Sequence, residues 1–206
     1  MNKWLCSTDP YNIPQYAFTN VGIGNEKLII ITTFSLNLFK LIGGVVVDDN
    51  DRVLVVKEKH FFGTQQLWKF PGGYAEQGED FGQTAIREVL EETGIKCEFQ
   101  SVIAFRHIHK FAFDCSDLYI VCHLKPIKNE SNTSEDELKV KKCLFEIDEC
   151  KWFPIEELKP LLSQFNSYII QKFESNRQNG IRIGMESIPS IIKNIDHNTY
   201  SIHKDF

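Results

Sequence analysis

The sequence of 206 residues predicts an α/β protein, an α/β/α sandwich around a mixed sheet. Short apolar runs bounded by turn residues alternate with helical patterns, and one segment has the periodicity of a strong amphipathic helix. A chain of this length that is 42% hydrophobic can bury one good core. We therefore expect a main domain over residues 43–206, with a helical C-terminal part over 155–206, preceded by an N-terminal segment over 1–42.

The stretch Leu28–Val47 is rich in apolar residues, as a membrane span would be. Thr32, Ser35 and Lys40 interrupt it, whereas a span needs about 20 mostly apolar residues. The first residues do not combine a basic start with an apolar run, as a secretory signal would. We therefore expect no membrane segment, and we interpret this stretch as a strand with its connection.

Two apolar runs, Gly43–Asp48 and Val53–Lys57, are joined by the turn sequence Asp-Asp-Asn-Asp and predict a β-hairpin. A short strand is expected at Leu67–Phe70, running into Pro-Gly-Gly. Further along, strands are expected at Glu98–Arg106, Leu118–Leu124, Cys143–Phe145 and Lys151–Phe153, and helices at Ile155–Lys159 and Phe165–Ser175. The polar residues 129–137 predict a loop.

The segment Asp80–Thr93 predicts the amphipathic helix. Its apolar face recurs at four-residue steps, at Phe81, Ala85, Val89 and Thr93. Glu79 and Asp80 stand at its start, where the helix dipole favours anions, and Gly94 stands where a left-handed residue closes a helix.

Three carboxylates of this helix share one face. Glu88, Glu91 and Glu92 stand at i, i+3 and i+4, where like charges repel by a few tenths of a kcal/mol per pair. Such a group of oxygen ligands suits a hard divalent cation. Arg87 can reach Glu91 four residues on, and Glu79 is its other expected partner. The alternative for the acidic pattern alone is a solvated helix face.

The complete pattern from Gly73 to Ile95 is G-x5-E-x7-R-E-U-x-E-E-x-G-U, where U is aliphatic. It resembles the signature of the Nudix hydrolases, and Trp68–Gly73 matches the usual lead-in. The flanking sequence resembles one branch, which contains plant ADP-ribose/NADH pyrophosphatases and an animal Nudix protein encoded antisense to a fibroblast growth factor gene.

The resemblance implies a metal-dependent hydrolase of a diphosphate linkage. Mg²⁺ or Mn²⁺ would be held by Glu88, Glu91 and Glu92, with the backbone carbonyl of Gly72. The general base would be Glu92 or Glu146, and the choice stays open. The favoured substrate is ADP-ribose or NADH; coenzyme A, dinucleoside polyphosphates, nucleotide-sugars and capped RNA stay open. A second hypothesis is a nucleotide-binding regulatory module with little turnover, which the intact set of carboxylates disfavours.

Substrate-binding candidates are fewer and have structural alternatives. Arg106 and His109, beside His107 and Lys110, could bind a phosphate or ribose, although a polar strand end has the same composition. Phe62, in the pair Phe61-Phe62, could stack on a nucleobase or anchor a loop.

In the resembling family, a motif like Val21–Gly24 leads almost directly into a strand like Gly43–Val47. Here residues 25–42 intervene. We interpret them as an insertion, either natural or an artefact of the gene model.

The remaining composition bears on partners and compartment. A net charge of −5 argues against a general nucleic-acid binder. The six cysteines contain no C-x-x-C pair, so we expect free thiols in a reducing compartment, the cytoplasm, with the nucleus or mitochondrion as alternatives. The family resemblance adds a homodimer as an expected assembly.

Overall fold

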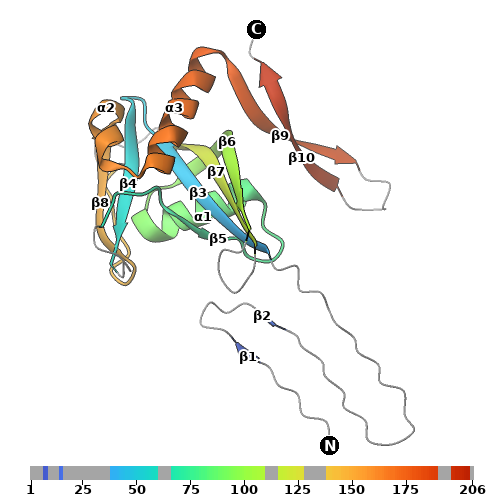
Figure 1. Cartoon of the computed structure of the whole chain (residues 1–206), viewed down its shortest axis with the longest axis horizontal. Helices are drawn as coiled ribbons and strands as arrows, with labels where there is room; N and C mark the ends of the chain where they lie inside the picture. Colours follow the sequence, from blue (N-terminus) through green and yellow to red (C-terminus); the bar gives the residue numbers. More distant parts are fainter. Residues whose placement is uncertain are drawn as a thin grey trace, which may run out of the picture.

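The computed structural model describes residues 7–8, 14–15, 38–59, 66–109, 116–127, 138–189 and 196–204 (Figure 1). The main sheet has the strand order β10-β9-β6-β7-β3-β4-β8, and β5 pairs with β3. Its strands are β3 (Leu38–Val47), β4 (Arg52–Glu58), β5 (Gly72–Tyr74), β6 (Cys97–Ile108), β7 (Ser116–Pro126), β8 (Ile147–Pro154), β9 (Ile181–Pro189) and β10 (Asp196–Lys204). Two further short strands, β1 (Ser7–Thr8) and β2 (Pro14–Gln15), pair with each other.

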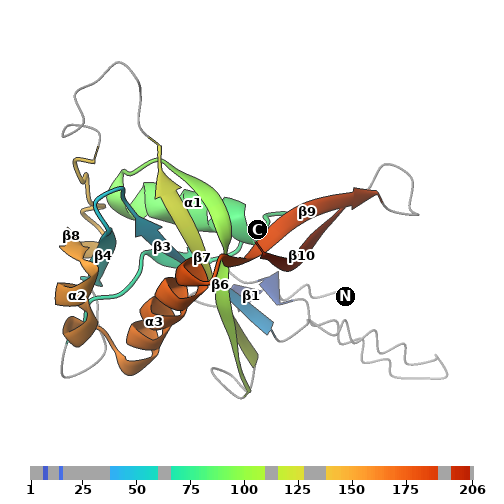
Figure 2. The ribbon, with the colours of Figure 1, turned by 90° about the horizontal axis from the view of Figure 1, so that it is seen from above.

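The sheet is mixed, as predicted, because β3 and β7 run parallel while the other pairings are antiparallel. The helices are α1 (Phe81–Thr93), α2 (Ile155–Leu158) and α3 (Gln164–Gln178), with a 3-10 turn η1 over Lys159–Leu161. Figure 2 shows α1 and α3 on opposite sides of the central strands. Among the described residues, no helix has the length and apolar character needed to cross a membrane.

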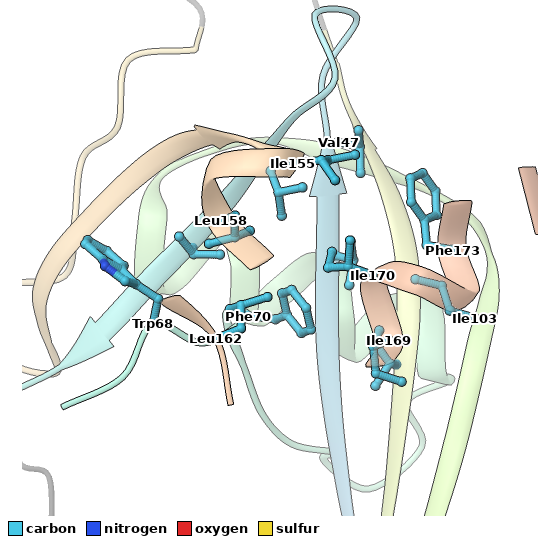
Figure 3. Packing of buried hydrophobic residues seen from close by; sticks show 14 residues of the cluster. Val47, Trp68, Phe70, Ile103, Ile155, Leu158, Leu162, Ile169, Ile170 and Phe173 are labelled. Atoms are coloured by element: carbon cyan, nitrogen blue, oxygen red, sulfur yellow. The ribbon is translucent and has the colours of Figure 1, made fainter. Parts of the chain in front are cut away.

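Alternation along β3 explains why both faces of the sheet are covered. Val45 and Val47 belong to the hydrophobic cluster under α2 and α3, which Figure 3 shows. Ile42 and Val46 belong to a second cluster, which includes Ala85 and Val89 of α1. Side chains of successive strand residues point to opposite faces, so a continuous apolar run supplies two cores. The predicted α/β/α sandwich is confirmed.

The predicted hairpin between the first two main strands is also confirmed. Val46 and Val47 of β3 pair with Leu54 and Val53 of β4. Asp48 closes the turn, because its Oδ1 accepts hydrogen bonds from the backbone N–H groups of Asn50 and Arg52 at 3.0 and 2.9 Å. A short acid that bonds its own backbone is typical of a turn.

Two expectations about short strands are wrong. Leu67–Phe70 forms only isolated bridges, Lys69 with Val56 and Trp68 with Leu162. No strand forms at Cys143–Phe145, since a turn over Leu144–Glu146 follows Cys143 and the strand starts at Ile147. In both places an apolar run predicted a strand, but no neighbouring strand offers a continuous ladder there.

The helical C-terminal part predicted for 155–206 ends at Gln178. Gly180 has φ 60°, a left-handed conformation that ends the helix, and the chain then forms the hairpin of β9 and β10. Isoleucines at 181 and 183 alternate with polar residues, the period of a strand. At the other end, β3 begins at Leu38 and runs through the domain boundary expected at residue 43. Residues 25–37 of the hypothesised insertion lie outside the described residues.

Candidate active site

Helix α1 is fixed at both ends. At its start, the backbone N–H of Asp80 donates to Gln83 Oε1 at 2.9 Å. At its end, Gly94 has φ 74° and its N–H bonds to the carbonyl of Leu90. Ala85 and Val89 are fully buried against the sheet, which holds the helix by its apolar face. Its acidic face therefore has a defined position over β5 and the loop that follows it.

Arg87 connects the acidic residues of this region. Its Nε and Nη2 donate to the two carboxylate oxygens of Glu79 at 2.7 and 2.9 Å, a bidentate pair. Its Nη1 donates to Glu88 at 2.7 Å and to Glu91 at 3.1 Å. The guanidinium lowers the pKa of Glu79 to about 2. Both partners predicted for Arg87, Glu79 and Glu91, are therefore in contact with it.

Glu92 lies deeper than the other acids. It is 5% exposed, and its Oε2 accepts a hydrogen bond from the N–H of Gly72 at 3.1 Å. Burial raises its pKa to about 8, against the opposing effects of Lys69 and this hydrogen bond. Glu88 is half-buried, and burial raises its pKa as well, although Arg87 opposes the change. Burial therefore disfavours the ionised form of both neighbouring acids, and a bound cation would favour it.

Gly73 lies so close to Glu88 that no side chain fits between them. A Cβ on Gly73 would meet the Glu88 carboxylate at 2.5 Å. The glycine therefore leaves room for that carboxylate against the backbone of β5. This gives a physical reason for a glycine at this position of the matched pattern.

These residues fit a hard divalent cation by the chemistry of their donor atoms. Glu88 and Glu91 bond the same Arg87 nitrogen, and Glu88 interacts electrostatically with Glu92, so the three carboxylates are neighbours. Within the described residues, however, no three acidic, histidine or cysteine side chains converge as a ready metal site. Glu88 and Glu91 are turned toward Arg87, and Glu92 toward Gly72. A cation bound by these carboxylate oxygens would replace their hydrogen bonds to Arg87 and Gly72.

Glu146 is brought to this cluster from far along the chain. The segment before β8 docks on the end of α1, since Lys141 and Cys143 donate backbone hydrogen bonds to Thr93 and Glu92 at 2.8 and 2.9 Å. Glu146 is exposed in the following turn and adds to the raised pKa of Glu88, so its charge lies within reach of the acidic cluster. The structure thus keeps both candidate bases, Glu92 and Glu146, near the same place.

The three substrate-binding candidates have different positions. Arg106 donates to the buried Asp117 at 3.1 Å, and its guanidinium lies over the rings of Tyr119 and Phe165. His109 is exposed and lies 3.3 Å from the hydroxyl of Ser116. Phe62 lies outside the described residues. Arg106 is therefore held by protein groups, and its role toward a substrate stays a prediction.

Two residues near the site were not found from the sequence. Tyr119 of β7 lies over β3, where a Cβ on Gly43 would come within 2.2 Å of its hydroxyl. Lys69 opposes the raised pKa of Glu92 and forms an ion pair with Glu58. Lys69 stands in the Trp68–Gly73 lead-in and is positioned by its bridge to Val56 of β4, whereas Tyr119 is brought to the site by the parallel pairing of β7 with β3.

The mixed sheet between helices, with an Arg-linked carboxylate cluster on α1, defines a domain of the Nudix class. The family model described as the NUDIX domain matches residues 40–173. The chain therefore belongs to the Nudix family, whose hydrolases generally use divalent metal ions.

Curated relatives confirm the branch that the sequence predicted. The chain is 41% identical over 160 residues to Nucleoside diphosphate-linked moiety X motif 6 of Xenopus laevis, which covers 77% of this chain and 60% of the relative. It is 37% identical over 176 residues to Nudix hydrolase 2 of Arabidopsis thaliana, with coverage of 79% and 58%. The human Nucleoside diphosphate-linked moiety X motif 6 is 34% identical over 214 residues, and the match covers 100% of this chain and 57% of the relative. The chain thus spans about three-fifths of the length of these relatives.

Solved structures share the fold. A MutT protein from Methanosarcina mazei has a TM-score of 0.54 at 17% identity, covering 71% of this chain and 99% of that chain. The NUDIX domain of NrtR from Shewanella oneidensis, in complex with ADP ribose, has a TM-score of 0.52 at 15% identity, with coverage of 68% and 88%.

Proposed function

We propose that the chain hydrolyses the diphosphate linkage of a nucleoside diphosphate joined to another moiety. The observation that carries this proposal is the complete acidic set of α1, in which Arg87 joins Glu79, Glu88 and Glu91 beside the buried Glu92. The names of the curated relatives, a nucleoside diphosphate-linked moiety X protein and a Nudix hydrolase, support the same reaction class.

In this proposal Glu88, Glu91 and Glu92 hold Mg²⁺ or Mn²⁺ with the carbonyl of Gly72. When bound, such ions neutralise charge on the diphosphate oxygens and lower the pKa of a bound water. Arg87 keeps the carboxylates together through its contacts with Glu79, Glu88 and Glu91. One carboxylate removes a proton from the attacking water, which adds to one phosphorus while the bridging P–O bond breaks.

Glu92 and Glu146 are the alternatives for that carboxylate. Glu92 is buried and bonded to Gly72, whereas Glu146 is exposed. Loss of a general base typically costs about 10²–10⁴-fold in rate. Glu146→Gln tests the choice, because a loss of that size with unchanged metal affinity assigns the base to Glu146, and full activity assigns it to Glu92.

ADP-ribose or NADH is the proposed substrate, giving AMP and a phosphorylated second product. The test is product analysis of the purified chain, with each metal, against ADP-ribose, NADH, NAD⁺, coenzyme A, a diadenosine polyphosphate, a nucleoside triphosphate and capped RNA. We expect the wild type to release AMP from ADP-ribose or NADH, and Glu92→Gln to lose at least about 10²-fold of that activity. Near-normal turnover by Glu92→Gln would sink the assignment.

The alternative function is a nucleotide-binding regulatory module with little turnover. It would be favoured if the folded wild type bound ADP-ribose but cleaved nothing on the panel.

The proposed compartment is the cytoplasm, and imaging of the tagged protein in cells tests it. A homodimer is also proposed, and light scattering after size exclusion would contradict it by giving a monomer mass.

A further inference from the structure

A cavity of about 240 Å³ lies between the sheet and the C-terminal end of α3. Strands β6, β7 and β9 and helix α3 all contribute to its wall. The lining residues that matter for its chemistry are Ser101, Ile103, His123, Phe173, Arg177 and Arg182. None of them has a role in the reaction proposed above.

The cavity is separate from the acidic cluster of α1. Along β7, Cys122 and Leu124 pack in the cluster with α1, so His123 between them points to the opposite face of the sheet. Arg177 and Arg182 also lie beyond residue 173, where the match to the family model ends. The cavity is therefore built partly by sequence that the family model does not include.

Its base is apolar. Ile103 and Phe173 are each 6% exposed and belong to the core cluster under α3. Figure 3 shows Ile103 close to the end of α3 that carries Phe173. Ser101, which is 8% exposed, adds a hydroxyl near this base. A ligand with a small organic body would therefore find both apolar contact and one polar partner inside.

The rest of the lining is basic. Arg177, Arg182 and His123 surround the space, and none of the lining residues, all within the described part of the chain, is acidic. Burial and the charges of Arg177 and Lys125 lower the pKa of His123 to about 4, so the ring is neutral but surrounded by positive charge. Basic groups around a partly apolar space are suited to an anion.

Arg177 is held near the cavity mouth and can change partners. Its guanidinium lies 5.4 Å from the centre of the Phe173 ring, and it bonds Asp51 at 2.5 Å. Both members of that ion pair are about half exposed, 49% and 60%. Exposed pairs are worth at most about 1 kcal/mol, so an anion in the cavity can compete with Asp51.

We propose that this cavity binds a phosphate group, either inorganic phosphate or a small phosphomonoester, at a site distinct from the α1 carboxylates. Arg177 and Arg182 would bind the phosphate oxygens, His123 and Ser101 would supply further hydrogen bonds, and Phe173 would contact an organic body. Typical ligand pockets have volumes of about 300–1,000 Å³, so this smaller space suits a compact ligand.

The test is calorimetric titration with inorganic phosphate and, separately, ribose 5-phosphate. The protein is the full chain with EDTA, so that metal-dependent binding at α1 does not contribute. We expect binding that weakens about tenfold or more in the double variant Arg177→Gln/Arg182→Gln. The same binding should persist in Glu92→Gln, because that residue lies on the other face of the sheet. Tighter binding of ribose 5-phosphate than of phosphate would identify a phosphomonoester.

The matched control is Lys172→Gln, which removes a cation from the same helix at a residue that does not line the cavity. It should bind as the wild type does. His123→Gln provides a second variant inside the cavity, should the double variant fold poorly. Absence of binding by the wild type, or equal weakening by Lys172→Gln and the double variant, would overturn the proposal. Neither result depends on whether the chain hydrolyses a diphosphate.

Discussion

Single residues of the same type carry different charges because their surroundings differ. Glu79 forms a bidentate pair with Arg87, and its pKa falls to about 2. Glu92, in the last turn of α1, is buried and accepts one backbone hydrogen bond, and its pKa rises to about 8. The compensating guanidinium accounts for the contrast, since it favours the charged form of Glu79 more than burial disfavours it.

His123 leads to a prediction about acid stability. Its folded-state pKa of about 4 lies below the ordinary value of 6.5, so the unfolded chain takes up a proton first as pH falls. Stability should therefore be lost between about pH 6.5 and pH 4, by at most about 3 kcal/mol for this residue. Urea denaturation of wild type and His123→Gln, in buffers without phosphate, should give a smaller loss for the variant. Parallel curves over this pH range would contradict the prediction.

At the level of elements, the C-terminal hairpin supports the start of α1. Tyr200 of β10 stacks on Phe81 with ring centres 4.9 Å apart and meets Phe99 edge-on at 6.4 Å. Asn198 donates to the carboxylate of Asp80 at 2.7 Å. The hairpin is joined to β6 mainly at Val102 and Ile183. The contacts of Tyr200 and Asn198 therefore add to the attachment of the hairpin to the domain.

Tyr200→Ala should lower the free energy of unfolding by about 2 kcal/mol, because it removes the ring between Phe81 and Phe99. Tyr200→Phe keeps the ring, and the hydroxyl is buried without a hydrogen-bond partner among the described residues. That variant should therefore be as stable as the wild type. Chemical denaturation of both variants measures the difference, and equal losses would show that the hydroxyl, not the ring, holds the hairpin.

At the level of the whole molecule, the candidate site depends on both the sheet and the segment that precedes β8. Gly72 reaches Glu92 because β5 pairs with β3, and Glu146 arrives because residues 141–143 bond the end of α1. A cation bound by the α1 carboxylates would therefore stabilise the native fold and not the unfolded chain.

Saturating Mn²⁺ should raise the melting temperature of the EDTA-treated chain. A ligand at about 100 times its dissociation constant stabilises by about 2.7 kcal/mol, or ~5–10 °C for a chain of this size. Glu92→Gln should show less than half of that shift, because one anionic oxygen donor is lost. Differential scanning fluorimetry with Ca²⁺ as a comparison ion measures it. An equal shift in both proteins would place the metal elsewhere.

The sequence by itself determined the family, the helix Asp80–Thr93, the β3–β4 hairpin and two partners of Arg87, Glu79 and Glu91. These features depend on local spacing: four-residue steps of apolar residues, a turn of short acids, and charges placed within one or two helical turns. Local rules failed for Cys143–Phe145, where an apolar run forms no strand, and for β9 and β10, which were expected to be helical but pair with each other as a hairpin.

Only the tertiary structure decided the burial of Glu92, the approach of Glu146 to Glu88, and the basic cavity around His123. Each is produced by contacts between segments far apart in the chain. Burial and electrostatic surroundings are properties of packed elements, so spacing alone does not specify them. The carboxylates that can perform the chemistry thus lie mainly in one helix. Their charge states depend on the segments that pack against that helix.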